Sequence, residues 1–186
     1  ATPFRSDGLS QVIFFTTGKI FCKITPKEAK QYLITPEIKF VETDYFFPIF
    51  DSTEFSILLS DMALNKKRNK LILDTYKNIG IDKQSVFISH RISQLEYLQK
   101  KIPNSKILTS KINKKERKKI IKNLNNKTLK VVLTTYGLFS TGIDIPSLEV
   151  VYMCTPIRSA RWIIQTAGRL KRKAKNKTKA IVIDFI

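Results

Sequence analysis

The sequence predicts an α/β domain in which a mostly parallel central sheet is covered by helices on both faces. Short apolar or β-branched runs alternate with helical segments along the second half of the chain. This alternation is typical of a parallel sheet, because parallel strands need long crossover connections, and these are usually helices. The expected strands are residues 85–89, 106–108, 130–135, 149–153 and 180–185, and the expected helices are residues 92–101, 113–124 and 161–171.

The first half of the chain is less regular. Residues 1–18 are expected to form a linker that leads into a strand at residues 19–24. Thr25 and Pro26 are the residue types preferred at the N-cap and the first position of a helix, so a short helix is expected to start there. The remaining expected elements are a strand at residues 40–48 and a long helical stretch with a break near Asn65.

The composition is that of a globular protein. Hydrophobic residues make up 42% of the 186 residues, no apolar run is long enough for a membrane span, and no signal peptide is visible. Cys22 and Cys154 lie far apart without ligand spacing, so we expect two reduced cysteines and no metal site. The single histidine, His90, does not by itself make a Ser-His-Asp triad.

The charge is strongly positive, with 34 Lys and Arg against 15 Asp and Glu and a formal net charge of +19. This favours a polyanionic partner such as nucleic acid; the alternative is a basic surface that only keeps the protein soluble. The expected helix at residues 113–124 carries much of this charge, and its basic face either contacts phosphate or is simply solvated. A second basic run, residues 171–179, is typical of a solvated loop.

Two segments have the residue types needed for nucleotide chemistry. The first reads T-T-Y-G-L-F-S-T-G-I-D-I-P from Thr134 to Pro146, and the second reads Q-T-A-G-R-L-K-R from Gln165 to Arg172. A strand that ends in Thr134 and Thr135 places hydroxyls and amides at the carboxyl edge of the sheet, where open α/β sheets bind ligands. Such groups suit phosphate contacts that do not depend on base sequence.

The later residues of both segments suit a bound nucleotide. Gly142 lets the backbone approach a ligand closely, and Asp144 is then placed to accept a hydrogen bond, for example from a ribose hydroxyl; the alternative is a local turn. Arg169 and Arg172 are three residues apart, which places them on one side of a helix. Two guanidinium groups held there neutralise the charge on a transferring phosphoryl group; the alternative is a pair of surface arginines.

These two segments resemble motifs V and VI of superfamily 2 helicases. Residues 1–9 resemble the end of motif III and the interdomain linker in the branch that contains XPB-like, phage UvsW-type and poxvirus-type helicases. Residues 85–91, followed by 95–98, resemble motif IV and its helix, and residues 108–111 with 116–117 resemble the next strand, loop and helix. Many members have arginine directly after the motif VI glutamine, where this chain has Thr166.

The resemblance implies a RecA-like helicase C-terminal domain at residues 19–186, preceded by the end of motif III and the linker at residues 1–18, as a piece of a larger protein. ATP and Mg²⁺ would be bound mainly by an upstream RecA-like domain, since this chain has neither a G-x-x-x-x-G-K-[ST] loop nor a D-E-x-[DH] box. The chain alone is therefore not expected to hydrolyse ATP.

The resemblance and the strand ends together assign the site residues. Arg169 and Arg172 are expected to be catalytic arginine fingers, and Gly142, Asp144 and Gln165 are expected to contact the nucleotide. Contacts to nucleic acid are expected from Ser89, His90, Arg91, Thr109, Ser110, Lys111, Thr134 and Thr135.

The predicted function is that of the C-terminal motor domain of an ATP-dependent helicase or translocase, with DNA as the preferred substrate. The alternatives are the translocase of a restriction enzyme and a stand-alone nucleic-acid-binding module without ATPase activity. Abundant Lys, Ile and Asn are typical of an AT-rich genome, such as that of some large DNA viruses. The expected location is intracellular: the host cytoplasm for a viral protein, and otherwise the cytoplasm or nucleus.

Overall fold

A computed structural model describes the chain except for residues 1–7, 23, 30–31, 49–50, 143 and 175–176. The chain forms two units, residues 1–33 and residues 34–186, which are described separately. This division differs from the boundary predicted at residue 18, and the assignment of the two segments to a linker and a motor domain stays a prediction.

The first unit contains two short helices, α1 (Ser10–Thr17) and α2 (Pro26–Ala29). The start of α2 is as predicted: the Thr25 amide donates to Glu28 Oε2 at 2.8 Å, and Thr25 Oγ1 accepts from the Glu28 amide at 3.3 Å. This reciprocal pair is a capping box, which satisfies donors that the first helical turn leaves free. Residues 1–7, which are most of the segment 1–9 that resembles the end of motif III and the linker, are outside the described residues.

The strand predicted at residues 19–24 is wrong. The described residues of this segment have no strand, and Ile20, Phe21 and Ile24 are exposed. The apolar run has the composition of a strand. A strand, however, is stable only when its backbone pairs with a neighbour and its apolar face is covered.

The second unit is built on a six-stranded sheet in the order β1-β6-β5-β2-β4-β3, with every neighbouring pair parallel. This confirms the predicted fold class. The strands are β1 (Glu37–Val41), β2 (Ser85–Ser89), β3 (Ser105–Leu108), β4 (Val131–Thr135), β5 (Val150–Met153) and β6 (Ile181–Phe185).

The first strand of this sheet begins and ends earlier than predicted. Residues 40–48 were expected, but β1 covers Glu37–Val41 and pairs with β6 from Glu37↔Ile181 to Val41↔Phe185. The strand register ends at Val41↔Phe185, and beyond it the Thr43 amide donates to the Ile186 carbonyl at 2.7 Å. The partner strand, rather than the apolar pattern, therefore sets the boundary of β1.

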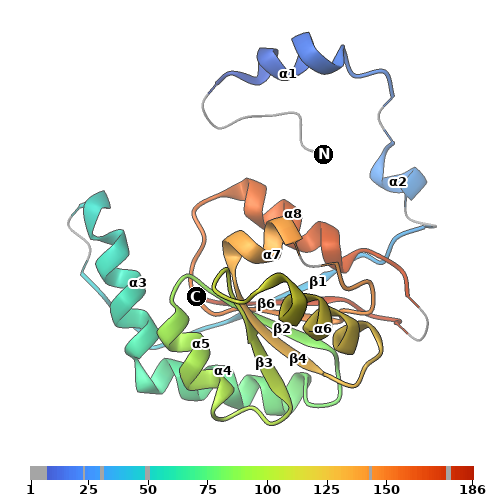
Figure 1. Cartoon of the computed structure of the whole chain (residues 1–186). Helices are drawn as coiled ribbons and strands as arrows, with labels where there is room; N and C mark the ends of the chain where they lie inside the picture. Colours follow the sequence, from blue (N-terminus) through green and yellow to red (C-terminus); the bar gives the residue numbers. More distant parts are fainter. Residues whose placement is uncertain (1–7, 23, 30–31, 49–50, 143, 175–176) are drawn as a thin grey trace. The chain divides into compact units, whose positions relative to one another are not determined.

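Helices cover both faces of the sheet (Figure 1). Side chains alternate across the pleat: Phe87 packs with α4 and α5, whereas Val86 and Ile88 pack with α6, α7 and α8. No helix in the described ranges is long and apolar enough to cross a membrane. The bounds are η1 (Ser52–Glu54), α3 (Phe55–Leu64), α4 (Lys66–Ile79), α5 (Ile92–Gln99), α6 (Lys114–Asn125), α7 (Tyr136–Gly142) and α8 (Ala160–Leu170).

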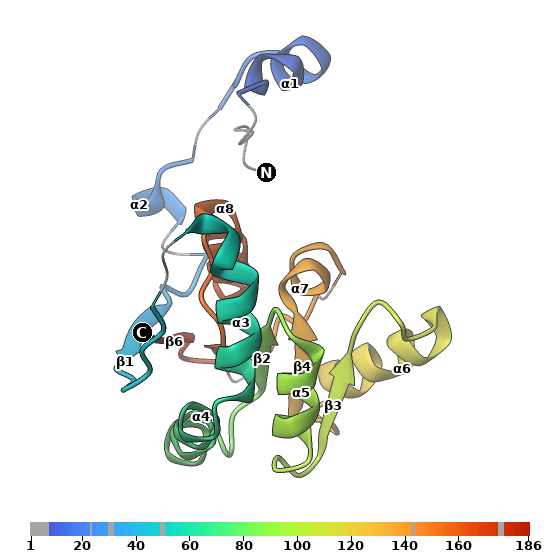
Figure 2. The ribbon, with the colours of Figure 1, turned by 90° about the vertical axis from the view of Figure 1, so that its left-hand side faces the viewer.

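Two predicted helix boundaries are confirmed by their caps. Asn65 separates α3 from α4, and its side-chain oxygen accepts from the Arg68 amide at 2.9 Å. Asn113 caps α6 by accepting from the Glu116 amide at 2.8 Å. The break at Asn65 turns the chain, so α4 lies against the sheet and α3 stands beside it (Figure 2).

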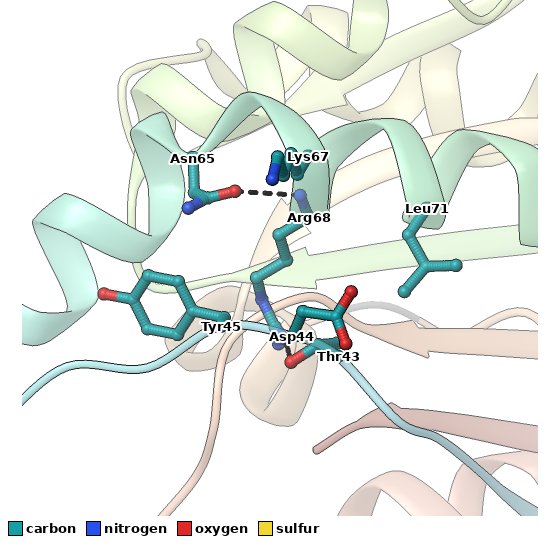
Figure 3. Close-up of a pocket in the computed structure, with 7 residues that line it drawn as sticks. All are labelled: Thr43, Asp44, Tyr45, Asn65, Lys67, Arg68 and Leu71. Carbon is teal, nitrogen blue, oxygen red and sulfur yellow. Dashed lines mark hydrogen bonds between the residues drawn. The ribbon is translucent and has the colours of Figure 1, made fainter.

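Arg68 is a buried cation that holds the ends of several strands. Its guanidinium donates to Thr43 Oγ1 at 3.2 Å and to the carbonyls of Cys154 at 3.2 Å and Phe185 at 2.9 Å. The side chain is only 3% exposed and reaches from α4 toward Thr43 under a cavity of about 170 Å³ (Figure 3). Burial lowers the pKa of Arg68. The group thus ties α4 to the carboxyl ends of β5 and β6.

Replacing Arg68 should destabilise the sheet. Arg68→Met keeps most of the volume but removes all three side-chain hydrogen bonds, so we expect a loss of about 2 kcal/mol in the free energy of unfolding. Lys67→Met, the exposed neighbour on the same helix, is the matched control and should change stability by less than about 0.5 kcal/mol. Urea denaturation of both variants measures the difference, and equal stabilities would contradict this role.

Candidate functional site

The parallel sheet brings the residues that follow β2, β4 and β5 to one edge. These strands are neighbours in the order β5-β2-β4. His90 follows β2, Tyr136 follows β4, and Thr155 lies two residues beyond β5. Carboxyl ends of adjacent parallel strands form the usual ligand site of open α/β sheets, so this edge is the candidate site.

Thr155 connects the three strand ends. Its Oγ1 accepts from the His90 amide at 3.1 Å and lies 2.9 Å from His90 Nδ1, and its carbonyl accepts from Tyr136 Oη at 2.6 Å. The His90 and Tyr136 rings are 4.4 Å apart. Burial, and to a lesser degree the charge of Arg91, lowers the pKa of His90. This shift favours the uncharged ring at neutral pH, and the predicted contact of His90 with nucleic acid stays a prediction.

Ser89 and Arg91 fix the loop after β2. Ser89 is fully buried; its Oγ donates to Gln94 Oε1 at 2.7 Å and accepts from the Arg91 amide at 3.0 Å. The Arg91 guanidinium donates to Ser60 Oγ at 2.9 Å and to both the carbonyl and Oγ of Ser56 at 2.7 Å. Both residues therefore hold α3 and α5 at this edge, and their predicted contacts with nucleic acid stay predictions.

The threonines and the loop after β3 divide into buried and surface groups. Thr134 is fully buried and its Oγ1 donates to the Leu108 carbonyl at 2.8 Å, while Thr109 is 6% exposed. These two hydroxyls are buried, so the adjacent residues in the chain are more accessible to a ligand than they are. The predicted residues that are partly or fully exposed here are Thr135, Ser110 and Lys111.

A cavity of about 310 Å³ opens between the ends of β2 and β4, the loop after β5 and the starts of α3 and α8. We call it the carboxyl-edge cavity. Four aromatic rings line it together with three polar side chains, and Gly137 and Ile157 complete the lining. The rings are those of Phe55, His90, Tyr136 and Trp162, and the polar groups are those of Thr135, Arg158 and Ser159.

A second group of predicted residues meets at the far ends of α7 and α8, and we call Asp144, Arg169 and Arg172 the arginine cluster. Arg172 Nη1 pairs with Asp144 Oδ1, and both side chains are exposed. The Arg169 guanidinium lies 5.7 Å from the centre of the Phe139 ring. Burial and the charge of Arg172 lower the pKa of Arg169, while Asp144 opposes that shift. The structure thus brings these three charges together, and their predicted roles toward a nucleotide stay predictions.

The other two predicted nucleotide residues lie next to this cluster in the chain. Gly142 is the last residue of α7, and Ile143 after it lies outside the described residues. Gln165 is half-buried on α8, four residues before Arg169, so the two share a face of that helix. Their contacts with a nucleotide stay predictions.

Helices α7 and α8 run side by side in the same direction. Near their starts the rings of Tyr136 and Trp162 meet edge to face at 6.1 Å, and further along Arg169 lies over Phe139. Beyond their ends, Arg172 meets Asp144. The carboxyl-edge cavity therefore lies at the start of both helices and the arginine cluster at their end.

Lys177 anchors the chain behind the arginine cluster. Its Nζ donates to the carbonyls of Leu170 at 2.7 Å, Arg172 at 3.0 Å and Pro146 at 3.1 Å. The side chain is only 8% exposed. The interpretation of residues 171–179 as a solvated loop is therefore wrong for Lys177, although Lys171, Lys173 and Lys179 are exposed. Carbonyls at a helix end attract a cation, which explains why this lysine turns inward.

Both cysteines are free. Cys154 is buried after β5, and burial raises the pKa of its thiol to about 12, whereas Cys22 is exposed. Within the described part of the chain, no group of three or more His, Cys, Asp or Glu side chains is arranged to hold a metal ion.

Sequence reasoning missed Phe55, Thr155, Arg158, Trp162 and Lys177. Phe55 and Trp162 are the first aromatic residues of two helices, and Arg158 packs on the Phe55 ring with its guanidinium carbon 4.0 Å from the ring centre. The single tryptophan of the chain was a usable signal, because a lone large aromatic ring beside a basic motif often lies at a binding surface.

Comparison with known sequences gives a consistent result. The chain matches the family described as "Helicase conserved C-terminal domain" over residues 65–174, more than half of its length. It is 29% identical over 206 residues to "Putative helicase 22" of Sulfolobus islandicus filamentous virus, covering 100% of this chain and 36% of that protein. It is 39% identical over 56 residues to "ATP-dependent DNA helicase uvsW" of Enterobacteria phage T4, covering 30% of this chain and 11% of that protein. The resemblance predicted from the motifs is confirmed.

Solved structures confirm the RecA-like fold. The "fragment structure of a putative HsdR subunit of a type I restriction enzyme" from Vibrio vulnificus YJ016 matches with a TM-score of 0.77 at 18% identity, covering 100% of this chain and 38% of that one. Dbp5 of S. cerevisiae bound to RNA and ADP BeF3 matches with a TM-score of 0.65 at 16% identity, covering 100% and 44%. The chain spans less than half of the length of each of these relatives.

Removing the Lys177 amine should loosen the segment behind the arginine cluster. Lys177→Met leaves three carbonyls without their donor, so we expect a loss of about 2 kcal/mol in the free energy of unfolding. Lys179→Met removes an exposed lysine two residues away and is the matched control. Equal urea midpoints for the two variants would contradict the anchoring role.

The same substitution should alter the pH dependence of stability. Burial lowers the pKa of Lys177 to about 8, although Glu149 opposes the shift. The unfolded chain regains a value of about 10.4, so between these values it binds the extra proton and stability rises with pH. The difference in free energy of unfolding between the wild type and Lys177→Met should therefore grow between about pH 8 and about pH 10.

Proposed function

The chain belongs to the family of helicase conserved C-terminal domains, and from this premise we propose that it is the second motor domain of an ATP-dependent superfamily 2 DNA helicase or translocase. In this proposal the carboxyl edge binds a nucleic-acid strand. The arginine cluster contacts ATP that is bound by an upstream RecA-like domain. The two domains would close on ATP and separate after its hydrolysis, which would shift them along the strand.

The observation that carries this proposal is the meeting of Asp144, Arg169 and Arg172 beyond the ends of α7 and α8. Two guanidinium groups beside one carboxylate leave a net positive charge there. An exposed ion pair contributes only about 0–1 kcal/mol, so Arg172 can leave Asp144 for a phosphoryl group at little cost. Asp144, once released, accepts a hydrogen bond from a ribose hydroxyl, as the motif predicted.

Nucleic-acid binding is supported by the net charge of +19 and by the groups at the carboxyl edge. Thr135, Ser110 and Lys111 are exposed or half-exposed there, and hydroxyl and ammonium groups are typical phosphate ligands. Such contacts do not read base sequence, which suits a motor that must move along any strand.

ATP and Mg²⁺ would be held mainly outside this chain. The sequence has no phosphate-binding loop and no acidic metal-binding box. Gly142, Asp144 and Gln165 are proposed to complete the nucleotide site when the domains close, and Arg169 and Arg172 to stabilise the charge of the transition state.

The DNA preference and the location rest on relatives. The uvsW protein is described as a DNA helicase, whereas Dbp5 was bound to RNA, so RNA is the alternative substrate. Similarity to the HsdR fragment favours one further candidate, the translocase of a restriction enzyme; a nuclease motif elsewhere in the full-length protein would identify it. Viral relatives support an intracellular location, the host cytoplasm for a viral protein.

Binding through phosphates should depend steeply on salt. The chain should bind a single-stranded oligonucleotide weakly and without sequence preference, and the logarithm of the binding constant should fall linearly with the logarithm of salt concentration, since each phosphate contact releases counterions. Fluorescence anisotropy at several salt concentrations measures the slope. Lys111→Ala should reduce the magnitude of this slope by the contribution of about one phosphate contact.

Lys101→Ala is the matched control for this test. Lys101 is also exposed but lies between α5 and β3, at the opposite edge of the sheet. Its substitution should leave the slope nearly unchanged. Binding that is tight and insensitive to salt would contradict the proposed interface.

The arginine assignment is tested in the full-length protein. Arg172→Ala should lower kcat for ATP hydrolysis by about 10³-fold, with little change in KM or in single-strand binding, because a finger acts on the charge of the transition state. Arg172→Lys keeps the charge but loses the planar fork, so it should remain impaired. Steady-state ATPase assays and a binding assay on the same samples give both values.

Two controls accompany this experiment. Lys171→Ala alters the exposed neighbour of Arg172 and should retain near wild-type turnover. The 186-residue chain alone should hydrolyse no ATP above a buffer blank. If Arg172→Ala kept the wild-type kcat, or lost strand binding as severely as turnover, the arginine assignment would be wrong.

A further inference from the structure

The carboxyl-edge cavity has a wall that phosphate binding does not explain. Phosphate ligands are charged or hydroxyl groups, but four of the side chains around this cavity are aromatic rings. Its volume of about 310 Å³ is at the lower end of the range of small-molecule pockets, roughly 300–1,000 Å³. A flat, ring-shaped group is the ligand for which such a wall provides the most contact area.

Tyr136 organises these rings. It is buried, its hydroxyl donates to the Thr155 carbonyl, and it meets the His90 ring at 4.4 Å and the Trp162 ring at 6.1 Å. Because its hydroxyl is bonded and its ring is buried, Tyr136 is a fixed surface on which the His90 and Trp162 rings pack. Trp162 is only half-buried, so part of its ring stays available for contact.

Phe55 and Arg158 form another part of the wall. The Arg158 guanidinium carbon lies 4.0 Å from the centre of the Phe55 ring, and Arg158 is exposed. A guanidinium group stacked on an aromatic ring presents a flat face, and it also supplies a positive charge for a phosphate beside a bound base. His90 adds an uncharged ring with hydrogen-bonding capacity, because burial lowers its pKa.

We propose that the carboxyl-edge cavity takes one nucleobase of the bound strand, stacked against Trp162 and Phe55. The proposal rests on the nucleic-acid binding proposed above and adds to it a base contact that any sequence can make. The net charge of +19 and the exposed Lys111, Ser110 and Thr135 favour a polyanionic chain as the source of the ring. Stacking accepts all four bases, since each has a π face.

Trp162 is the single tryptophan of the chain, so its fluorescence reports on this cavity alone. We expect a single-stranded oligonucleotide to quench Trp162 in proportion to binding measured by anisotropy. An oligonucleotide of the same length with abasic sites throughout its central part should bind through its phosphates about tenfold more weakly and leave the fluorescence nearly unchanged.

Phe55→Ala removes one wall and keeps the reporter. It should weaken binding of the normal oligonucleotide by about tenfold while binding of the abasic one stays as in the wild type. Phe46→Ala, which alters an exposed phenylalanine outside the cavity, is the matched control and should behave as the wild type. Unchanged abasic binding in Phe55→Ala also shows that the variant is folded.

The remaining outcomes separate this proposal from the function on which it rests. If neither oligonucleotide bound at low salt, the proposed nucleic-acid function would fail. If both bound equally and Trp162 were not quenched, nucleic-acid binding would stand and the base contact would be wrong. A change of Trp162 fluorescence with protein concentration, without nucleic acid, would assign the cavity to a second copy of the chain and would also overturn the proposal.

Discussion

All six strands of the sheet run parallel, and this constraint determines where the candidate site of the second unit lies. Each strand ends at the same edge, so residues far apart in the sequence become neighbours there: His90, Tyr136 and Thr155 join through the hydrogen bonds of Thr155. Arg68 holds the adjacent ends of β5 and β6 from inside the fold. If one of these strands were antiparallel, the residues that follow it would lie at the opposite edge.

The polar residues at this edge have two different roles. Ser89 and Thr134 are fully buried, and their hydroxyls hold Gln94 and the Leu108 carbonyl. They fix the loops, because a buried hydroxyl without a partner would cost about 1–3 kcal/mol. Thr135 and Lys111 remain accessible, so they are the groups that a strand would meet. Neighbouring residues such as Thr134 and Thr135 can thus differ in role, since one is buried in the fold and the next is partly exposed.

The sequence predicted the parallel sheet and the residues at its strand ends, because local apolar runs and short motifs contain that information. It could not predict the carboxyl-edge cavity: Phe55 and Trp162 are far apart in the chain and meet only through the packing of α3 and α8. The sequence also could not predict the burial of Lys177, because the three carbonyls that it contacts come together only in the folded chain. The strand predicted at residues 19–24 was wrong because a strand-like composition does not provide a neighbouring strand to pair with.

Helices α7 and α8 begin at the carboxyl-edge cavity and lead to the arginine cluster. Helix α8 has 11 residues, so it spans about 16 Å as one rigid rod. With the roles proposed above, the start of α8 contacts the nucleic-acid strand and its end contacts the nucleotide. Because the helix is rigid, a displacement at one end also displaces the other. Linkage then demands reciprocity: whatever factor the strand applies to nucleotide affinity, the nucleotide applies to strand affinity. The affinity for the strand and the affinity for the nucleotide would then both depend on the same displacement of α8.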